Sequence, residues 1–267
     1  MIFDLLQYSF VQRALLAGVV LALLYAVLGV FVVVRKMSFW SEGIAHASLA
    51  GVAVALITGT QPLLVALVVA VLFAILMTQL EKRTNLSFDT LIGVLFTSFM
   101  ALGLVIMNQV SGYQAELVSY LFGNILTISY VDLVITIVMT LVVLAYVMKY
   151  NKTLTTLSLN KEVSQVQGIR SDLHEQLFAI ALAVAVVLGV KLVGIILVSA
   201  LLIIPPAIAK LTSRSFYGFQ MHAVMWSLLI VVVGLLISLL YNQPSGPVII
   251  LTGSALFLLT VARNHMK

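Results

Sequence analysis

Long apolar runs separated by short polar segments form the main pattern along this chain. Each run is roughly 15 to 25 residues long, close to the length that a helix needs to cross a hydrocarbon core about 30 Å thick. Strands of a membrane barrel alternate apolar and polar residues. These runs are continuous, so the pattern predicts helices. The candidate spans cover residues 10–34, 43–58, 62–80, 88–109, 131–148, 175–190, 194–210, 222–240 and 247–262.

Composition supports a membrane protein. Hydrophobic residues make up 63% of the 267 positions and charged residues only 9%, whereas a soluble domain carries roughly 25% charged residues. In lipid, helices satisfy the backbone polar groups internally. The sequence therefore predicts an all-α polytopic membrane protein. Because three of the candidate spans are short, eight or nine transmembrane helices are expected, in a single domain over residues 1–267.

The basic residues predict the orientation of the chain. All but two of its 14 Lys and Arg residues fall on one side of the predicted topology, in short loops and at the C-terminus, and only Arg13 and Lys191 fall on the other. Because cytoplasmic loops carry the excess of Lys and Arg, the segment 149–174 and the C-terminus are expected inside. For nine spans the N-terminus is then outside. The net charge of +5 is explained by this topology, so no nucleic-acid partner is expected.

One stretch, residues 35–51, contains a candidate metal site. Glu42 and His46 are four residues apart, so on a helix they share one face. A carboxylate and an imidazole suit zinc or manganese, and the chain has no Cys to offer a thiolate. Ionisable residues within a membrane are functional candidates because their burial is costly. The alternative is that Glu42 is interfacial and His46 makes a helix–helix hydrogen bond.

Small residues recur beside this pair. They predict close approach of a neighbouring helix, because small side chains let two backbones come together. The stripe consists of Gly43, Ala47, Gly51 and Ala55.

The segment 149–174 contains a pattern of its own. Leu159, Val163 and Val166 recur at helical spacing, Asn160 is a good N-cap, and glycine follows the last of them at position 168. The pattern predicts a short amphipathic helix at the cytoplasmic face. It either docks on a partner or packs on its own bundle.

Two prolines, Pro205 and Pro206, interrupt an apolar run. Proline removes a backbone donor and breaks a helix. The pair is interpreted as a hinge or cavity wall, or else as a helix end near the inner face.

Two motifs are absent. The sequence has no Gly-x-x-x-x-Gly-Lys-Ser/Thr loop, so this chain is not expected to hydrolyse ATP itself. It also has no His-Glu-x-x-His motif, which argues against an intramembrane zinc protease.

Residues 35–51 resemble the signature of the zinc/manganese/iron ABC permease family, with Glu42 where aspartate is commoner. Residues 116–126 resemble that family's acid…Tyr-Leu-Phe-Gly-Asp segment, with Asn124 in place of the aspartate. Residues 191–207 resemble its Lys-Val-Val-Gly…Ser-Ala-Leu-Leu…Pro segment. Together with the cytoplasmic loop, these matches extend from about residue 30 to about residue 210, in the order found in the family.

The resemblance implies a type II ABC importer permease in the bacterial cytoplasmic membrane. It implies a homodimer of the permease, an ATPase subunit and an extracytoplasmic solute-binding protein. No permanently bound cofactor is expected; the metal is cargo, with zinc ahead of manganese because His46-Ala47-Ser48-Leu49 resembles zinc members. Glu116 is expected to contact cations or the binding protein, unless it is an ordinary solvated carboxylate. The residues expected to couple to the ATPase are Leu159, Asn160, Glu162, Val163, Val166 and Gly168.

Two other classes remain as alternatives. A stand-alone secondary carrier would also have buried carboxylate and His, but it has no need of a helix that docks an ATPase. A membrane-embedded enzyme would need a nucleophile–base motif, which the sequence lacks.

Overall fold

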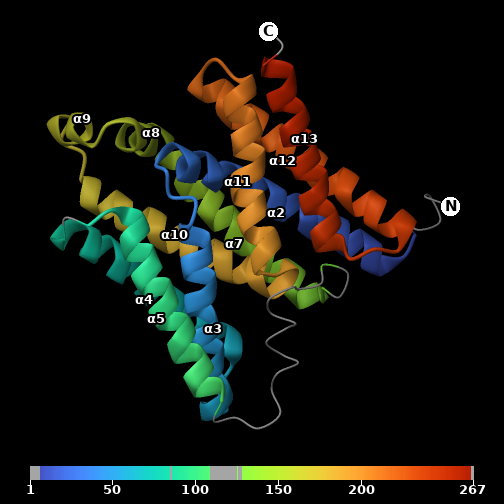
Figure 1. Ribbon diagram of the computed structural model, residues 1–267, viewed down its shortest axis with the longest axis horizontal. Coiled ribbons are helices and arrows are strands. Elements are labelled where there is room, and N and C mark those ends of the chain that lie inside the picture. Colours follow the sequence, from blue (N-terminus) through green and yellow to red (C-terminus); the bar gives the residue numbers. More distant parts are fainter. Residues whose placement is uncertain (1–6, 85, 109–124, 126–127, 266–267) are drawn as a thin grey trace.

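The computed structural model describes residues 7–84, 86–108, 125 and 128–265 (Figure 1). Within this part of the chain, nine helices are long and apolar enough to cross a membrane. The predicted fold class is confirmed, and of the two expected helix counts the described residues contain nine. These helices are α2 (Ser9–Val34), α3 (Trp40–Thr58), α4 (Pro62–Arg83), α5 (Phe88–Met107), α7 (Tyr130–Lys149), α10 (Ser171–Val193), α11 (Ile195–Thr212), α12 (Phe216–Tyr241) and α13 (Ser245–His265).

Several helices are longer than the sequence predicted, and α10 and α3 show why. The expected span 175–190 is part of α10, which begins at Ser171, and the expected span 43–58 is part of α3, which begins at Trp40. In α10 the added first turn carries Asp172, and in α3 it carries Glu42. Carboxylates favour the first turn of a helix because of its dipole. Apolarity alone therefore underestimates the length of these helices.

The helices α2 and α10 form the centre of the bundle. About two thirds of each is buried, and the hydroxyl of Tyr25 on α2 donates to the carbonyl of Ala185 on α10 at 2.9 Å. The helices α3, α4 and α5 lie together at one side, and α12 and α13 lie at the opposite side (Figure 1). The bundle therefore has two flanks joined by a buried middle.

Ion pairs group the helix ends in the way that the topology predicted. Lys191, in the last turn of α10, lies 2.6 Å from Asp132 in the first turn of α7. Both of these ends are expected outside. Lys82, in the last turn of α4, lies 2.6 Å from Asp172 in the first turn of α10, and both of those ends are expected inside.

The helix α11 continues through both prolines, so the expected helix break is wrong. Pro206 has no N–H to offer to the carbonyl of Leu202 four residues earlier. That carbonyl lies against Gly29 of α2, at the place where a Cβ on Gly29 would be. Pro205 and Pro206 are both buried. The neighbouring helix therefore surrounds the freed carbonyl in protein, as membrane helices with internal prolines require.

Candidate functional site

The first two turns of α3 carry Glu42 and His46. The turn before α3 brings Trp40 into a buried stack on Phe88 of α5, with ring centroids 5.7 Å apart and planes 17° apart. This stack fixes the start of the helix. Glu42 is then exposed in the first turn, and His46 is half-buried one turn further along the same face.

The small-residue stripe packs against α4, as predicted. A Cβ on Gly43 would lie 3.0 Å from the ring of Phe73, and a Cβ on Gly51 would lie 2.8 Å from the Cα of Ala66. Both neighbours belong to α4. Only glycine permits this separation of the backbones, so the stripe fixes the rotation of α3 in the bundle.

Two other helices border the face of α3 that carries the pair. The hydroxyl of Ser41 lies 3.3 Å from the hydroxyl of Ser199 on α11. On the other side, the His46 ring meets Phe96 of α5 edge-on, with centroids 4.6 Å apart. Glu42 lies between these contacts and is exposed. Within one chain, the described residues leave this carboxylate uncovered.

The pair offers two donors to a cation. Among the described residues, no group of three or more His, Asp or Glu side chains is placed to hold a metal ion. The Nδ1 atom of His46 is buried and has no hydrogen-bond partner among the described residues. Since zinc takes about four ligands, any further donors to a cation here come from groups other than the His, Asp and Glu side chains that the structure describes.

The segment 149–174 contains two short helices, where the sequence predicted one. The predicted helix is α9 (Lys161–Val166), and α8 (Asn151–Leu159) precedes it. Leu159 therefore ends α8 and does not begin α9. The helix α8 is not evident in the sequence, because its threonines have low helix propensity. The burial of Leu154 and Leu157 in the bundle stabilises it.

The predicted cap and stop of α9 are confirmed. The side-chain oxygen of Asn160 accepts from the backbone N–H groups of Glu162 at 2.9 Å and Val163 at 3.2 Å. After the helix, Gly168 has φ +71°, a left-handed conformation that favours glycine. The boundaries of α9 are thus set by local chemistry.

The three apolar residues that the sequence assigned to the amphipathic helix are exposed. Leu159 is 66% exposed, Val163 43% and Val166 90%, and Glu162 is exposed beside them. A helix that packed on its own bundle would bury these side chains. The exposed apolar surface favours docking on a partner.

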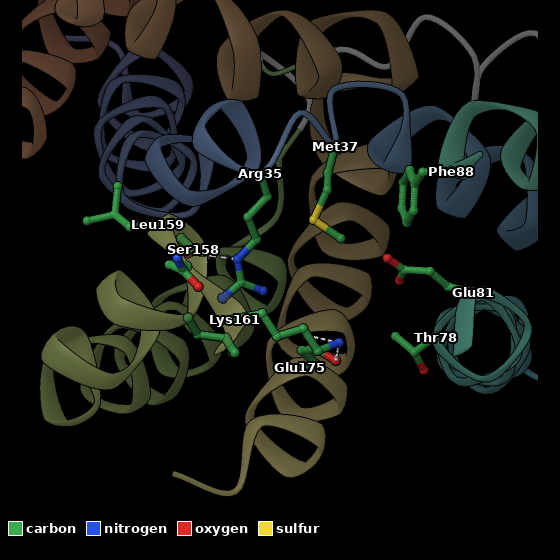
Figure 2. A pocket seen from close by; sticks show the side chains of 11 residues that line it. Arg35, Met37, Thr78, Glu81, Phe88, Ser158, Leu159, Lys161 and Glu175 are labelled. Carbon is green, nitrogen blue, oxygen red and sulfur yellow. Dashed lines mark hydrogen bonds and ion pairs between the residues drawn. The ribbon is translucent and has the colours of Figure 1, made fainter. Parts of the chain in front are cut away.

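A cavity of about 310 Å³ lies between this segment and the adjacent ends of α2, α4 and α10 (Figure 2). Lys161, at the start of α9, lies 2.8 Å from a carboxylate oxygen of Glu175 on α10. Lys82 of α4 lies 3.8 Å from the same carboxylate group. Lys161 and Lys82 thereby link α9 and α4 to α10 through the carboxylate of Glu175. The lining residues are Arg35, Met37, Thr78, Glu81, Phe88, Leu157, Ser158, Leu159, Asn160, Lys161 and Glu175.

Arg35 anchors the end of α2 in this cavity. Its Nε donates to the hydroxyl of Ser158 on α8 at 2.7 Å, and its guanidinium lies 4.7 Å from the centroid of the Phe178 ring. Burial lowers the pKa of Arg35, and the negative charge of Glu175 opposes that shift; the group remains a cation, since arginine titrates far above neutral pH. In the sequence, Arg35, Lys82 and Lys161 indicate only the topology, because the residues that they contact lie far away along the chain.

Three predicted residues remain. Glu116, and most of the motif around it, lies outside the described residues. Pro205 and Pro206 are buried within α11. The Glu42–His46 pair and the cavity are linked through the chain itself, because Arg35 and Met37 line the cavity and Glu42 follows in the first turn of α3.

Comparisons with known proteins agree on one family. A profile of the ABC 3 transport family matches residues 7–264. The high-affinity zinc uptake system membrane protein ZnuB of Haemophilus influenzae is 34% identical over 97% of this chain and 99% of that protein. The manganese transport system membrane protein MntC of Halalkalibacterium halodurans is 31% identical over 96% of this chain and 88% of that protein. Among solved structures, PsaBC from Streptococcus pneumoniae in complex with Fab matches with a TM-score of 0.85 at 30% identity, over 97% of this chain and 94% of that one.

Proposed function

The chain belongs to the ABC 3 transport family of metal-ion permeases, and on that premise we propose that its cargo is zinc, with manganese second. The chain is the membrane permease subunit of an ABC importer for zinc or manganese. The resemblance seen in the sequence is thereby confirmed. The observation that carries the proposal is the Glu42–His46 pair, an uncovered carboxylate beside a half-buried imidazole on a membrane-spanning helix. An imidazole suits zinc, whereas manganese prefers oxygen donors.

The exposed position of Glu42 supports a homodimer. A carboxylate on a spanning helix is costly in lipid, so such residues face protein or water. In a single chain, the described residues leave the Glu42 face of α3 open. A second copy that covers this face would enclose a path for the ion between the two subunits, with one pair contributed by each.

The exposed helix α9 supports docking of a separate ATPase subunit. ATP hydrolysis is a property of that subunit, and the permease receives the resulting movement. Val163 and Val166 would pack in the ATPase, and the ion pair of Lys161 with Glu175 would carry the movement of α9 to α10. This arrangement disfavours a stand-alone carrier driven by an ion gradient, which has no use for such a surface.

The permease would lie in the bacterial cytoplasmic membrane. Its outer face would receive the ion from an extracytoplasmic solute-binding protein. The cation then passes Glu42 and His46 and leaves toward the cytoplasm. No permanently bound cofactor is part of this mechanism. Glu116 stays a candidate for contact with the binding protein or the ion.

The test replaces His46 with Ala in the assembled importer. We expect zinc uptake to be lost. The permease should still purify with its ATPase, because His46 is only half-buried and its loss should not unfold α3. The matched control is His222→Ala, since His222 lies 3.1 Å from Thr212 at the connection between α11 and α12, away from the pair. Undiminished uptake by the His46 variant would remove the pair from the path.

A further inference from the structure

A small cavity of about 60 Å³ lies beside His46, between α3 and α5. Its lining is apolar except for the imidazole of His46 and the thioethers of two methionines. Gly103 of α5 closes one end, because it packs against Ala50 of α3 so tightly that a Cβ would lie 3.3 Å from the Ala50 Cα. The lining residues are His46, Leu49, Ala50, Phe99, Met100, Gly103, Leu104 and Met107.

The helix α5 brings Met100 to the same small cavity as the imidazole of His46. Phe96 meets the His46 ring edge-on at 4.6 Å, and Met100 follows four residues later, which puts it on the same face of the helix one turn further along. Both His46 and Met100 line the cavity. Met100 is 41% exposed, so its side chain is not locked in the core.

The His, Asp and Glu side chains that the structure describes leave the donors around this place incomplete. The described part of the chain offers no third His, Asp or Glu to join the pair, and the Nδ1 atom of His46 is buried without a hydrogen-bond partner. A thioether is a soft donor that suits zinc and softer cations and does not suit manganese, which prefers carboxylate and water.

We infer that Met100 is a specificity-determining residue of the permease, whose sulfur makes the Glu42–His46 site favour zinc and cadmium over manganese. The inference rests on the proposed role of that pair in holding the cargo. Met100 would act on the choice of cation and would play no part in the ATP-driven movement. A methionine that only fills space would give the same selectivity when replaced by leucine, since the two side chains have similar volume.

The experiment measures binding of radioactive zinc to the purified permease–ATPase complex without the solute-binding protein, so that only the permease selects the cation. Unlabelled cadmium and manganese compete for the site. In the Met100→Leu variant we expect the cadmium concentration that halves zinc binding to rise about fivefold, while the manganese concentration stays the same or falls, because a soft donor is lost. Met100→Cys keeps a sulfur donor and should retain the cadmium response. Met139→Leu, on α7 and outside the cavity, is the control.

Equal cadmium and manganese competition in wild type and Met100→Leu would overturn the inference. Loss of all zinc binding in both Met100 variants would also overturn it, because the role would then be structural. Failure of the underlying function looks different: zinc binding would survive in His46→Ala. If His46→Ala abolishes binding and Met100→Leu keeps the wild-type selectivity, only the inference about Met100 fails.

Discussion

Lys161, the first residue of α9, lies 2.8 Å and 3.0 Å from the two carboxylate oxygens of Glu175 on α10. Glu175 is also within 3.8 Å of Lys82 at the end of α4. The side chain of Glu175 is only 19% exposed, so solvent screens these contacts less than at an open surface. One acid therefore ties the helix that is expected to meet the ATPase to two membrane-spanning helices.

The first prediction concerns this tie. Glu175→Gln should leave the complex folded, because partly exposed ion pairs contribute only about 0–1 kcal/mol each. It should raise the number of ATP molecules hydrolysed per metal ion taken up, since movement of α9 would reach α10 less directly. The measurement is the ratio of ATPase rate to uptake rate in proteoliposomes that hold the complete importer. Asp89→Asn, at an exposed acid in the first turn of α5, is the control; an equal ratio in Glu175→Gln and wild type would contradict the coupling role.

The second prediction concerns docking of the ATPase. Val163→Asp should sharply lower the amount of ATPase that purifies with the permease, because it puts a charge into an apolar contact. The side chain is already 43% exposed, so the permease itself should fold and insert normally. Gln165→Asp places the same charge at an exposed polar position of α9 and should have little effect. A normal yield of ATPase with Val163→Asp would argue that α9 lies outside the interface.

The third prediction concerns the close approach of α2 and α11. Gly29→Ala should destabilise the permease by about 1–3 kcal/mol, because the added methyl would overlap the carbonyl of Leu202. Gly93→Ala on α5 should be neutral or slightly stabilising, since nothing lies within 4 Å of its Cβ position and alanine is the better helix former. Thermal unfolding of the two variants in detergent gives the comparison. Equal thermal unfolding midpoints for Gly29→Ala and wild type would mean that α2 and α11 make room for the methyl group with no loss of stability.

The fourth prediction concerns the proposed homodimer. The chain has no cysteine, so a single introduced thiol cannot cross-link within one copy. Leu49 is half-buried and lies two turns beyond Glu42 on the same face of α3. A short bifunctional thiol reagent should link two copies of the Leu49→Cys variant in native membranes, giving a product of twice the permease mass. Val138→Cys, 52% exposed on α7, should link less. Equal linkage by both variants, or none by Leu49→Cys, would place the contact between copies elsewhere.

The sequence could predict features that depend on neighbours along the chain. The cap at Asn160, the stop at Gly168 and the shared face of Glu42 and His46 all follow from spacing within one helix. The close approach at Gly43 and Gly51 follows from the absence of side chains.

Features that depend on distant segments were missed. The helix α8 owes its stability to burial of Leu154 and Leu157, which its polar, threonine-rich sequence does not reveal. The helix α11 stays intact through Pro206 because Gly29, far away on α2, leaves room for the freed carbonyl. The ion pair of Lys82 with Asp172 and the exposure of Glu42 likewise depend on how the helices pack, which no local pattern encodes.

The most direct test of the central claim is uptake of trace radioactive zinc in cells that carry or lack this gene, before and after depletion of ATP at a maintained membrane potential, with and without excess manganese. The account predicts zinc uptake that requires both the gene and ATP and that excess manganese does not suppress. Uptake that survives ATP depletion would contradict the importer, and suppression by manganese would contradict zinc as the preferred cargo.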